Sequence, residues 1–163
     1  MYRSVQDFLE DWSRESALTL NVLSALTDAS LSQRVTPERG RTLGELAWHL
    51  AGSISGMLGA GGLQVEGPGF GAPVPGSARE IADVYKKTSE AAAAAVRREW
   101  TDGKLAEKLL LFGRIDTTYG GLLNTIVRHQ IHHRGQMTVL MRQAGLVPPG
   151  VYGPNEEETA AMR

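Results

Sequence analysis

The stretch T-Y-G-G-L-L-N-T-I-V-R-H-Q-I-H-H-R-G-Q-M-T-V-L-M-R-Q-A, residues 118–144, contains a long helical pattern that decides the fold class. Its apolar side chains recur at steps of three and four residues, which is the spacing of one face of an α-helix. Gly145 follows as a C-terminal cap, and Pro148 and Pro149 prevent the helix from continuing. The stretch therefore predicts a long helix with one buried face.

Three further segments show helical periodicity. The first covers about residues 4–27, the second covers about residues 42–58, and the third begins at Ser77. The second and third each begin with a capping box, a Thr or Ser followed three residues later by Glu. Long helices without an alternating strand pattern predict an all-α fold, an antiparallel four-helix bundle.

The connecting segments are less clearly defined than the helices. A loop rich in glycine and proline, residues 59–76, follows the second helix, and a loop of this length is usually functional or mobile. Residues 104–116 fit a short strand, a helical turn or an extended crossover. We expect the tail, residues 146–163, to be extended or frayed. The whole chain, residues 1–163, has the length of one domain.

The composition excludes several classes of function. The 17 basic residues are interspersed with 18 acidic ones and the net charge is −1, so no basic stripe for nucleic acid is present. The absence of cysteine excludes disulfides, thiolate ligands and cysteine nucleophiles. No apolar run approaches the roughly 20 residues of a membrane span. We expect a cytoplasmic protein that binds neither nucleic acid nor a membrane.

The four histidines lie on only two of the predicted helices: His49 on the second and the others on the last. Successive helical residues are about 100° apart around the axis, so His133 lies about 40° from His129. Both fall on the buried face, one turn apart, whereas His132 falls about 60° away on the flank. The spacing therefore predicts that His129 and His133 point inward as a pair.

Other polar residues of the helical segments are less easily interpreted. Gln136 falls near the edge of the buried face, where it could orient a bound ligand or simply pack. Arg128 and Arg134 fall on faces where we expect solvent. On the first helix, Ser16 and Thr19 interrupt the apolar stripe, which fits either a polar site or a tolerated defect in the core.

An inward pair of histidines one turn apart suits a shared metal ion, and His49 is the candidate for a third ligand. A buried polar group without a partner costs about 1–3 kcal/mol, and a shared ion removes this cost. The alternative is three core histidines, each with its own hydrogen-bond partner. Three imidazoles with an open fourth position are typical of catalytic metal sites, and zinc, nickel, copper and iron all accept imidazole.

Three motifs carry a resemblance to a known family. They are T-L-G-E-L-A-W-H-L-A on the second helix, H-Q-I-H-H-R-G-Q on the last helix, and the ending L-M-R-Q-A-G-L-V-P-P-G-V-Y-G-P. In order and spacing the chain resembles the DinB/YfiT-like superfamily of metal-binding four-helix bundles over nearly its whole length. The resemblance implies a three-histidine metal site formed by His49, His129 and His133. We expect the ion to be a divalent transition metal, zinc or nickel first.

The resemblance also implies a class of activity. Some relatives are transferases or isomerases that use a low-molecular-weight thiol, and members are often homodimers. We therefore expect a homodimeric metal-dependent transferase or hydrolase-like enzyme that acts on a small-molecule substrate with a thiol cosubstrate. His132 is a candidate for proton transfer or for support of the metal ligands, with a plain surface histidine as the alternative. A non-catalytic metal-binding stress protein and a helical dimer without metal are the alternative functions.

Overall fold

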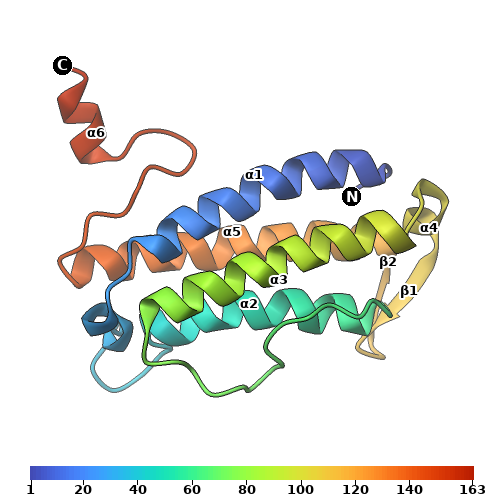
Figure 1. Cartoon of the computed structure of the whole chain (residues 1–163), viewed down its shortest axis with the longest axis horizontal. Helices are drawn as coiled ribbons and strands as arrows, with labels where there is room; N and C mark the ends of the chain where they lie inside the picture. Colours follow the sequence, from blue (N-terminus) through green and yellow to red (C-terminus); the bar gives the residue numbers. More distant parts are fainter.

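A computed structural model of the protein describes residues 1–163 and is mostly helical. Four long helices lie side by side (Figure 1): α1 (Val5–Ser24), α2 (Leu43–Ala60), α3 (Ala78–Glu99) and α5 (Tyr119–Gln143). α1 and α2 each pack against both α3 and α5. Each long helix contributes apolar side chains to one core between them.

The ends of the long helices lie close to the positions that the sequence predicts. The hydroxyl of Thr42 accepts from the backbone of Glu45, whose carboxylate accepts from Thr42 in return, so the first capping box is formed. Ser77 caps α3 in the same way but without the reciprocal bond. Gly145 follows α5 with a φ of 76°, a conformation that glycine adopts without strain. Local capping chemistry thus sets these boundaries.

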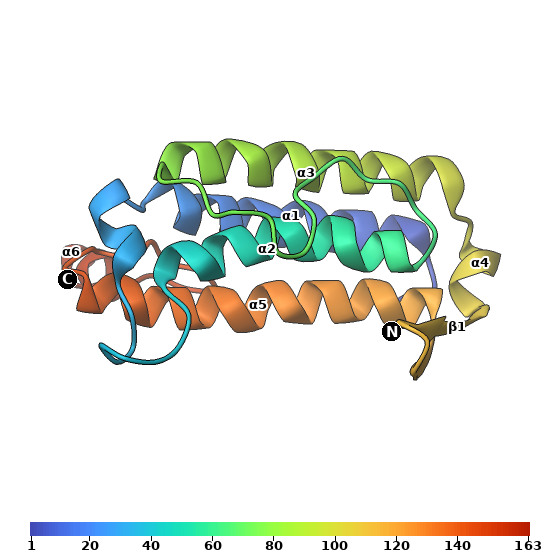
Figure 2. The same cartoon turned by 90° about the horizontal axis from the view of Figure 1, so that it is seen from below.

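The directions of the helices correct the expectation of an antiparallel arrangement. α2 and α3 run the same way, as do α1 and α5 (Figures 1 and 2). The glycine- and proline-rich loop makes this possible, because residues 61–77 contain no helix or strand and return the chain along α2. An extended chain covers about 3.3 Å per residue and a helix about 1.5 Å, so the loop is long enough for the return.

The segment between α3 and α5 corrects the expectation of an all-α chain. It contains a helical turn, α4 (Asp102–Ala106), followed by two antiparallel strands, β1 (Lys108–Leu111) and β2 (Ile115–Thr118). The turn between the strands places Phe112 and Gly113 at positive φ. Of the three alternatives for residues 104–116, the structure therefore contains two: a helical turn and a short strand.

Besides α4, two further short helices lie outside the four long ones. A turn of 3-10 helix, η1 (Asp28–Ser32), follows α1. At the other end of the chain, α6 (Glu156–Ala161) replaces part of the predicted extended or frayed tail. Asn155 and Glu158 form a capping box, which supplies the backbone partners that a short helix needs to begin.

None of the helices combines the length and the apolar composition that a membrane crossing requires.

Candidate metal centre

Three histidines from two helices meet between α2 and α5. The Nε2 atom of His129 lies 3.1 Å from Nε2 of His49 and 3.1 Å from Nε2 of His133. One ring nitrogen from each residue lies within 4.8 Å of the other two. The two histidines that the sequence places on the inward face of α5 therefore do meet His49.

The separations between the ring nitrogens suit a common metal ion. A metal ion binds imidazole at about 2.0–2.1 Å, so two tetrahedral ligands of one ion lie about 3.3 Å apart. The two separations from Nε2 of His129, each 3.1 Å, are close to this value, and all three nitrogens lie within 4.8 Å of one another. The three histidines can thus hold one ion without a large movement of either helix.

The charge state of the cluster also favours a metal ion. Burial, with smaller contributions from Arg41 and His133, lowers the pKa of His49 to about 4. Burial and the neighbouring histidines lower the pKa of His129 to about 4, and burial likewise lowers the pKa of His133. The imidazoles are therefore neutral at pH 7, and only neutral imidazole offers a lone pair to a metal.

Gln136 contacts one of these histidines directly. Its Oε1 lies 2.7 Å from Nδ1 of His133. An amide oxygen can only accept, so Nδ1–H donates and the lone pair of His133 is on Nε2, toward the other two rings. By contrast, Nδ1 of His129 is buried without a hydrogen-bond partner. Gln136 therefore holds His133 in the tautomer that a metal site requires.

The structure keeps His132 apart from the cluster. Its ring lies 4.9 Å from that of His133, centroid to centroid, but the residue is exposed. Its side chain forms no hydrogen bond, and the group of converging nitrogens does not include it. The flank position expected for His132 agrees with this placement.

A larger cavity, about 420 Å³ in volume, borders the cluster on the side of His133 and Gln136. Arg41 and Gly40 add further polar groups to its lining. The rest of its lining is apolar and comes from Val35, Leu46, Val139 and Leu140. This cavity can accept a small molecule with an apolar body beside the cluster.

A smaller cavity, about 190 Å³ in volume, borders the cluster on the side of His49. The crossover loop after α2 forms much of its wall, and Nε1–H of Trp48 donates to the backbone oxygen of Ala72 at 3.1 Å. Phe70 packs so closely on Gly56 that a Cβ there would lie 2.1 Å from the ring. The loop, whose role the sequence left open, thus forms one wall of the site.

Arg41 lines both cavities, and sequence reasoning missed it. It directly precedes the capping residue of α2, outside any periodic pattern. Only its place in the folded chain, next to the histidine cluster, identifies it as a residue of the site.

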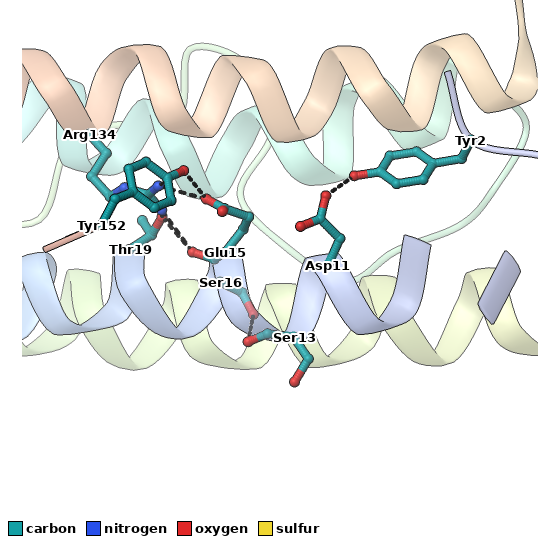
Figure 3. A network of polar contacts seen from close by, with 8 residues as sticks. All are labelled: Tyr2, Asp11, Ser13, Glu15, Ser16, Thr19, Arg134 and Tyr152. Atoms are coloured by element: carbon teal, nitrogen blue, oxygen red, sulfur yellow. Dashed lines mark hydrogen bonds and ion pairs between the residues drawn. The ribbon is translucent and has the colours of Figure 1, made fainter. Parts of the chain in front are cut away.

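The largest correction concerns Arg134, which the sequence places on a solvent-facing side of the last helix. It is only 1% exposed. Its Nη2 lies 2.6 Å from Oε2 of Glu15, and its Nη1 donates to Oγ1 of Thr19 at 3.1 Å (Figure 3). α5 packs against α1 as well as α2, so a second side of the helix is buried.

The same network explains the polar residues in the stripe of α1. Thr19 is part of it, whereas Ser16 is only partly buried and its hydroxyl donates to the backbone of Ser13 (Figure 3). Tyr152, from the tail, accepts from Arg134 at 2.6 Å and donates to Glu15 at 2.7 Å. The polar break in the stripe therefore receives an arginine and does not line the histidine cluster.

Comparison with known proteins identifies relatives over nearly the whole chain. The model of the DinB family matches residues 1–163. The Bacillus subtilis protein YrdA is 43% identical over 160 residues, which are 98% of this chain and 95% of YrdA.

Two solved structures resemble the fold. The crystal structure of a DinB-like protein from Bacillus cereus has a TM-score of 0.88 and 46% identity, and the match covers 93% of this chain and 100% of that one. The DinB-like protein YjoA from Bacillus subtilis has a TM-score of 0.67 at 18% identity, with 91% and 99% of the two chains covered. At that identity YjoA supports the fold alone.

Proposed function

This chain belongs to the DinB family, and from that premise we propose that it is a metal-dependent transferase that uses a small thiol as cosubstrate. We propose that His49, His129 and His133 bind one divalent ion, zinc or nickel, within a four-helix bundle. The observation that carries the proposal is the convergence of three Nε2 atoms from two helices.

The state of the three imidazoles supports metal binding. Each is neutral at pH 7 because burial lowers its pKa. Gln136 fixes the tautomer of His133 through Nδ1, as hydrogen-bond partners of metal-bound histidines commonly do. Three protein ligands would leave room for a water or a substrate as a further ligand, which is typical of catalytic rather than structural sites.

The chemistry follows from that open position. A divalent ion, if held by His49, His129 and His133, would lower the pKa of a water or thiol bound to it and so make a nucleophile available near pH 7. The chain has no cysteine, so any thiol nucleophile must come from a second molecule.

Two cavities support a transferase over a hydrolase. A transferase that passes a group directly from one substrate to the other must hold both beside one reactive centre at the same time. Here the larger cavity borders His133 and the smaller one borders His49, so the two ligands would reach the histidines from different sides. The exposed His132 has no part in this proposal.

Metal analysis of untagged protein tests the first half of the proposal. We expect close to one equivalent of zinc or nickel per chain after purification or reconstitution. Less than about 0.1 equivalent of any transition metal would contradict the metal site, because a folded three-histidine site retains its ion against dilution. His133→Ala is the matched variant, and we expect it to lose the metal while it remains folded.

Ligand binding and turnover test the second half. In cobalt-substituted protein, added azide or a small thiol should change the visible spectrum if the fourth position is open. A screen of electrophiles with several small thiols should then reveal thiol transfer that His133→Ala lacks. A spectrum that no added ligand changes would instead indicate a sequestering or stabilising metal site.

A further inference from the structure

Arg41 is a cation without a partner beside the metal centre. It is exposed, it borders both cavities, and no ion pair in the structure includes it. The nearby Arg34 differs, because it donates to the backbone oxygen of Gly40 and lies 4.0 Å from the carboxylate of Glu45. The guanidinium of Arg41 is therefore free to bind a ligand.

The lining of the two cavities decides where an anion would bind. Glu45 contributes a carboxylate to the smaller cavity, which disfavours an anionic ligand there. No acidic residue lines the larger cavity, where the polar side chains are Arg41, His133 and Gln136. An anion beside Arg41 is thus best accommodated in the larger cavity.

We propose that the larger cavity binds a small amphipathic anion, whose carboxylate or phosphate contacts Arg41 and whose hydrocarbon part packs on the apolar wall. That wall is formed by Val35, Leu46, Val139 and Leu140. That the anion is a substrate rests on the proposed function. Binding of the anion in the cavity requires no metal ion. Arg41 would be the residue that selects anionic over neutral substrates.

The size and chemistry of the cavity suit such a ligand. A volume of about 420 Å³ lies within the range of small-molecule sites. A guanidinium presents a planar fork of donors that matches carboxylate and phosphate oxygens. Arg41 also lowers the pKa of His49, after the larger effect of burial, which agrees with its place beside the cluster.

The test compares three probes that share one hydrocarbon chain: hexanoate, hexyl phosphate and the neutral hexan-1-ol. Each is titrated into the full-length ¹⁵N-labelled protein, once loaded with zinc and once after treatment with a chelator, and the dissociation constant is measured by NMR. We expect both anions to bind at least tenfold more tightly than the alcohol in both preparations. The anion with the lower constant identifies carboxylate or phosphate as the preferred group.

Variants of one arginine then test the assignment to Arg41. Arg41→Ala should weaken binding of the preferred anion about tenfold to a hundredfold, the usual size of a charge-assisted hydrogen bond, and leave hexan-1-ol unchanged. Arg41→Lys should retain part of the affinity. Arg39→Ala is the matched control, because Arg39 lies in the same exposed segment but lines neither cavity. This variant should leave the dissociation constants of all three probes unchanged.

The position of the bound probe provides an independent readout. We expect the backbone signals of Gln136 and Val139 to shift, whereas the indole signal of Trp48, in the smaller cavity, should not. Equal anion affinity in the wild type and Arg41→Ala would overturn the inference, as would shifts confined to Trp48. Failure of the metal or thiol experiments would leave these constants unaffected, so the two proposals can fail separately.

Discussion

Two polar clusters lie on different sides of α5, and two adjacent residues of this helix belong to different clusters. His133 faces α2 and joins the histidine cluster, whereas the next residue, Arg134, faces α1 and joins Glu15. In the arginine network the charges are paired, and Thr19 and Tyr152 accept further hydrogen bonds. In the histidine cluster, ring nitrogens of the same kind face one another at 3.1 Å.

The difference is the one expected between a structural network and the metal site that we propose. Buried polar groups in proteins are normally satisfied, and those that are not call for an explanation such as a bound ion. The arginine network needs nothing from outside the chain. In the histidine cluster, Nδ1 of His129 has no hydrogen-bond partner. The Nε2 atoms of the three rings also lie close together, and a metal ion bound between them would relieve this crowding. Five experiments test this contrast.

The largest effect should come from breaking the arginine network. Arg134→Met leaves the carboxylate of Glu15 buried without its cation, so the free energy of unfolding should fall by about 3–5 kcal/mol. Urea denaturation measures this. Arg128→Met, an exposed site on the same helix, should change it by about 0.5 kcal/mol or less.

A double variant separates a lost ion pair from lost packing. Glu15→Met with Arg134→Met removes both charges, and it should be more stable than Arg134→Met alone. Equal stability of the single and double variants would show that the pairing of these two charges does not stabilise the fold.

The histidine cluster should show the opposite pattern, with little change in the stability of the metal-free protein but loss of its response to metal. At a zinc concentration one hundred times the Kd, bound metal adds about 2.7 kcal/mol, or a rise in Tm of about 5–10 °C. Thermal unfolding with and without zinc should show this rise in the wild type and in His132→Ala but not in His133→Ala. Identical behaviour of the two variants would contradict the assignment of the inward pair.

A smaller effect should follow from loss of the partner of His133. Gln136→Ala removes the acceptor of Nδ1–H, so zinc affinity should fall about tenfold to a hundredfold. Competition with a chromophoric chelator measures the Kd. Gln136→Glu retains an acceptor and should restore most of the affinity, whereas a residue that only packs would show no such rescue.

The smallest effect should be the pH dependence of the stability of the metal-free protein. The pKa of His129 is about 4 in the folded state and about 6.5 in an unfolded chain, so the unfolded state binds more protons between these values. Stability should therefore be independent of this group above pH 6.5 and fall as the pH drops toward 4. The fall is modest, because the ring is only half-buried and solvent screens its charge.

Chemical denaturation between pH 7 and 5 in the presence of a chelator measures this dependence. His129→Gln should make the fall shallower than in the wild type. An unchanged slope would show that protonation of this ring does not oppose folding.

The sequence by itself determined the features that depend on local chemistry. Periodicity and capping residues predicted the long helices to within a few residues, as the first capping box and Gly145 show. The spacing of His129 and His133 predicted that both point inward, because a four-residue step returns to the same face of a helix. The pairing with His49 could be proposed because it is the one histidine outside the last helix.

Only the tertiary structure decided what each helix face meets. Periodicity gives a direction around a helix axis but not the neighbour that lies there, so Arg134 was assigned to solvent when α1 buries it. The shared direction of α2 and α3 depends on the path of the crossover loop, which has no periodicity to read. Arg41 reaches the site because the fold places the start of α2 beside α5, and a contact between distant segments leaves no pattern in either segment alone.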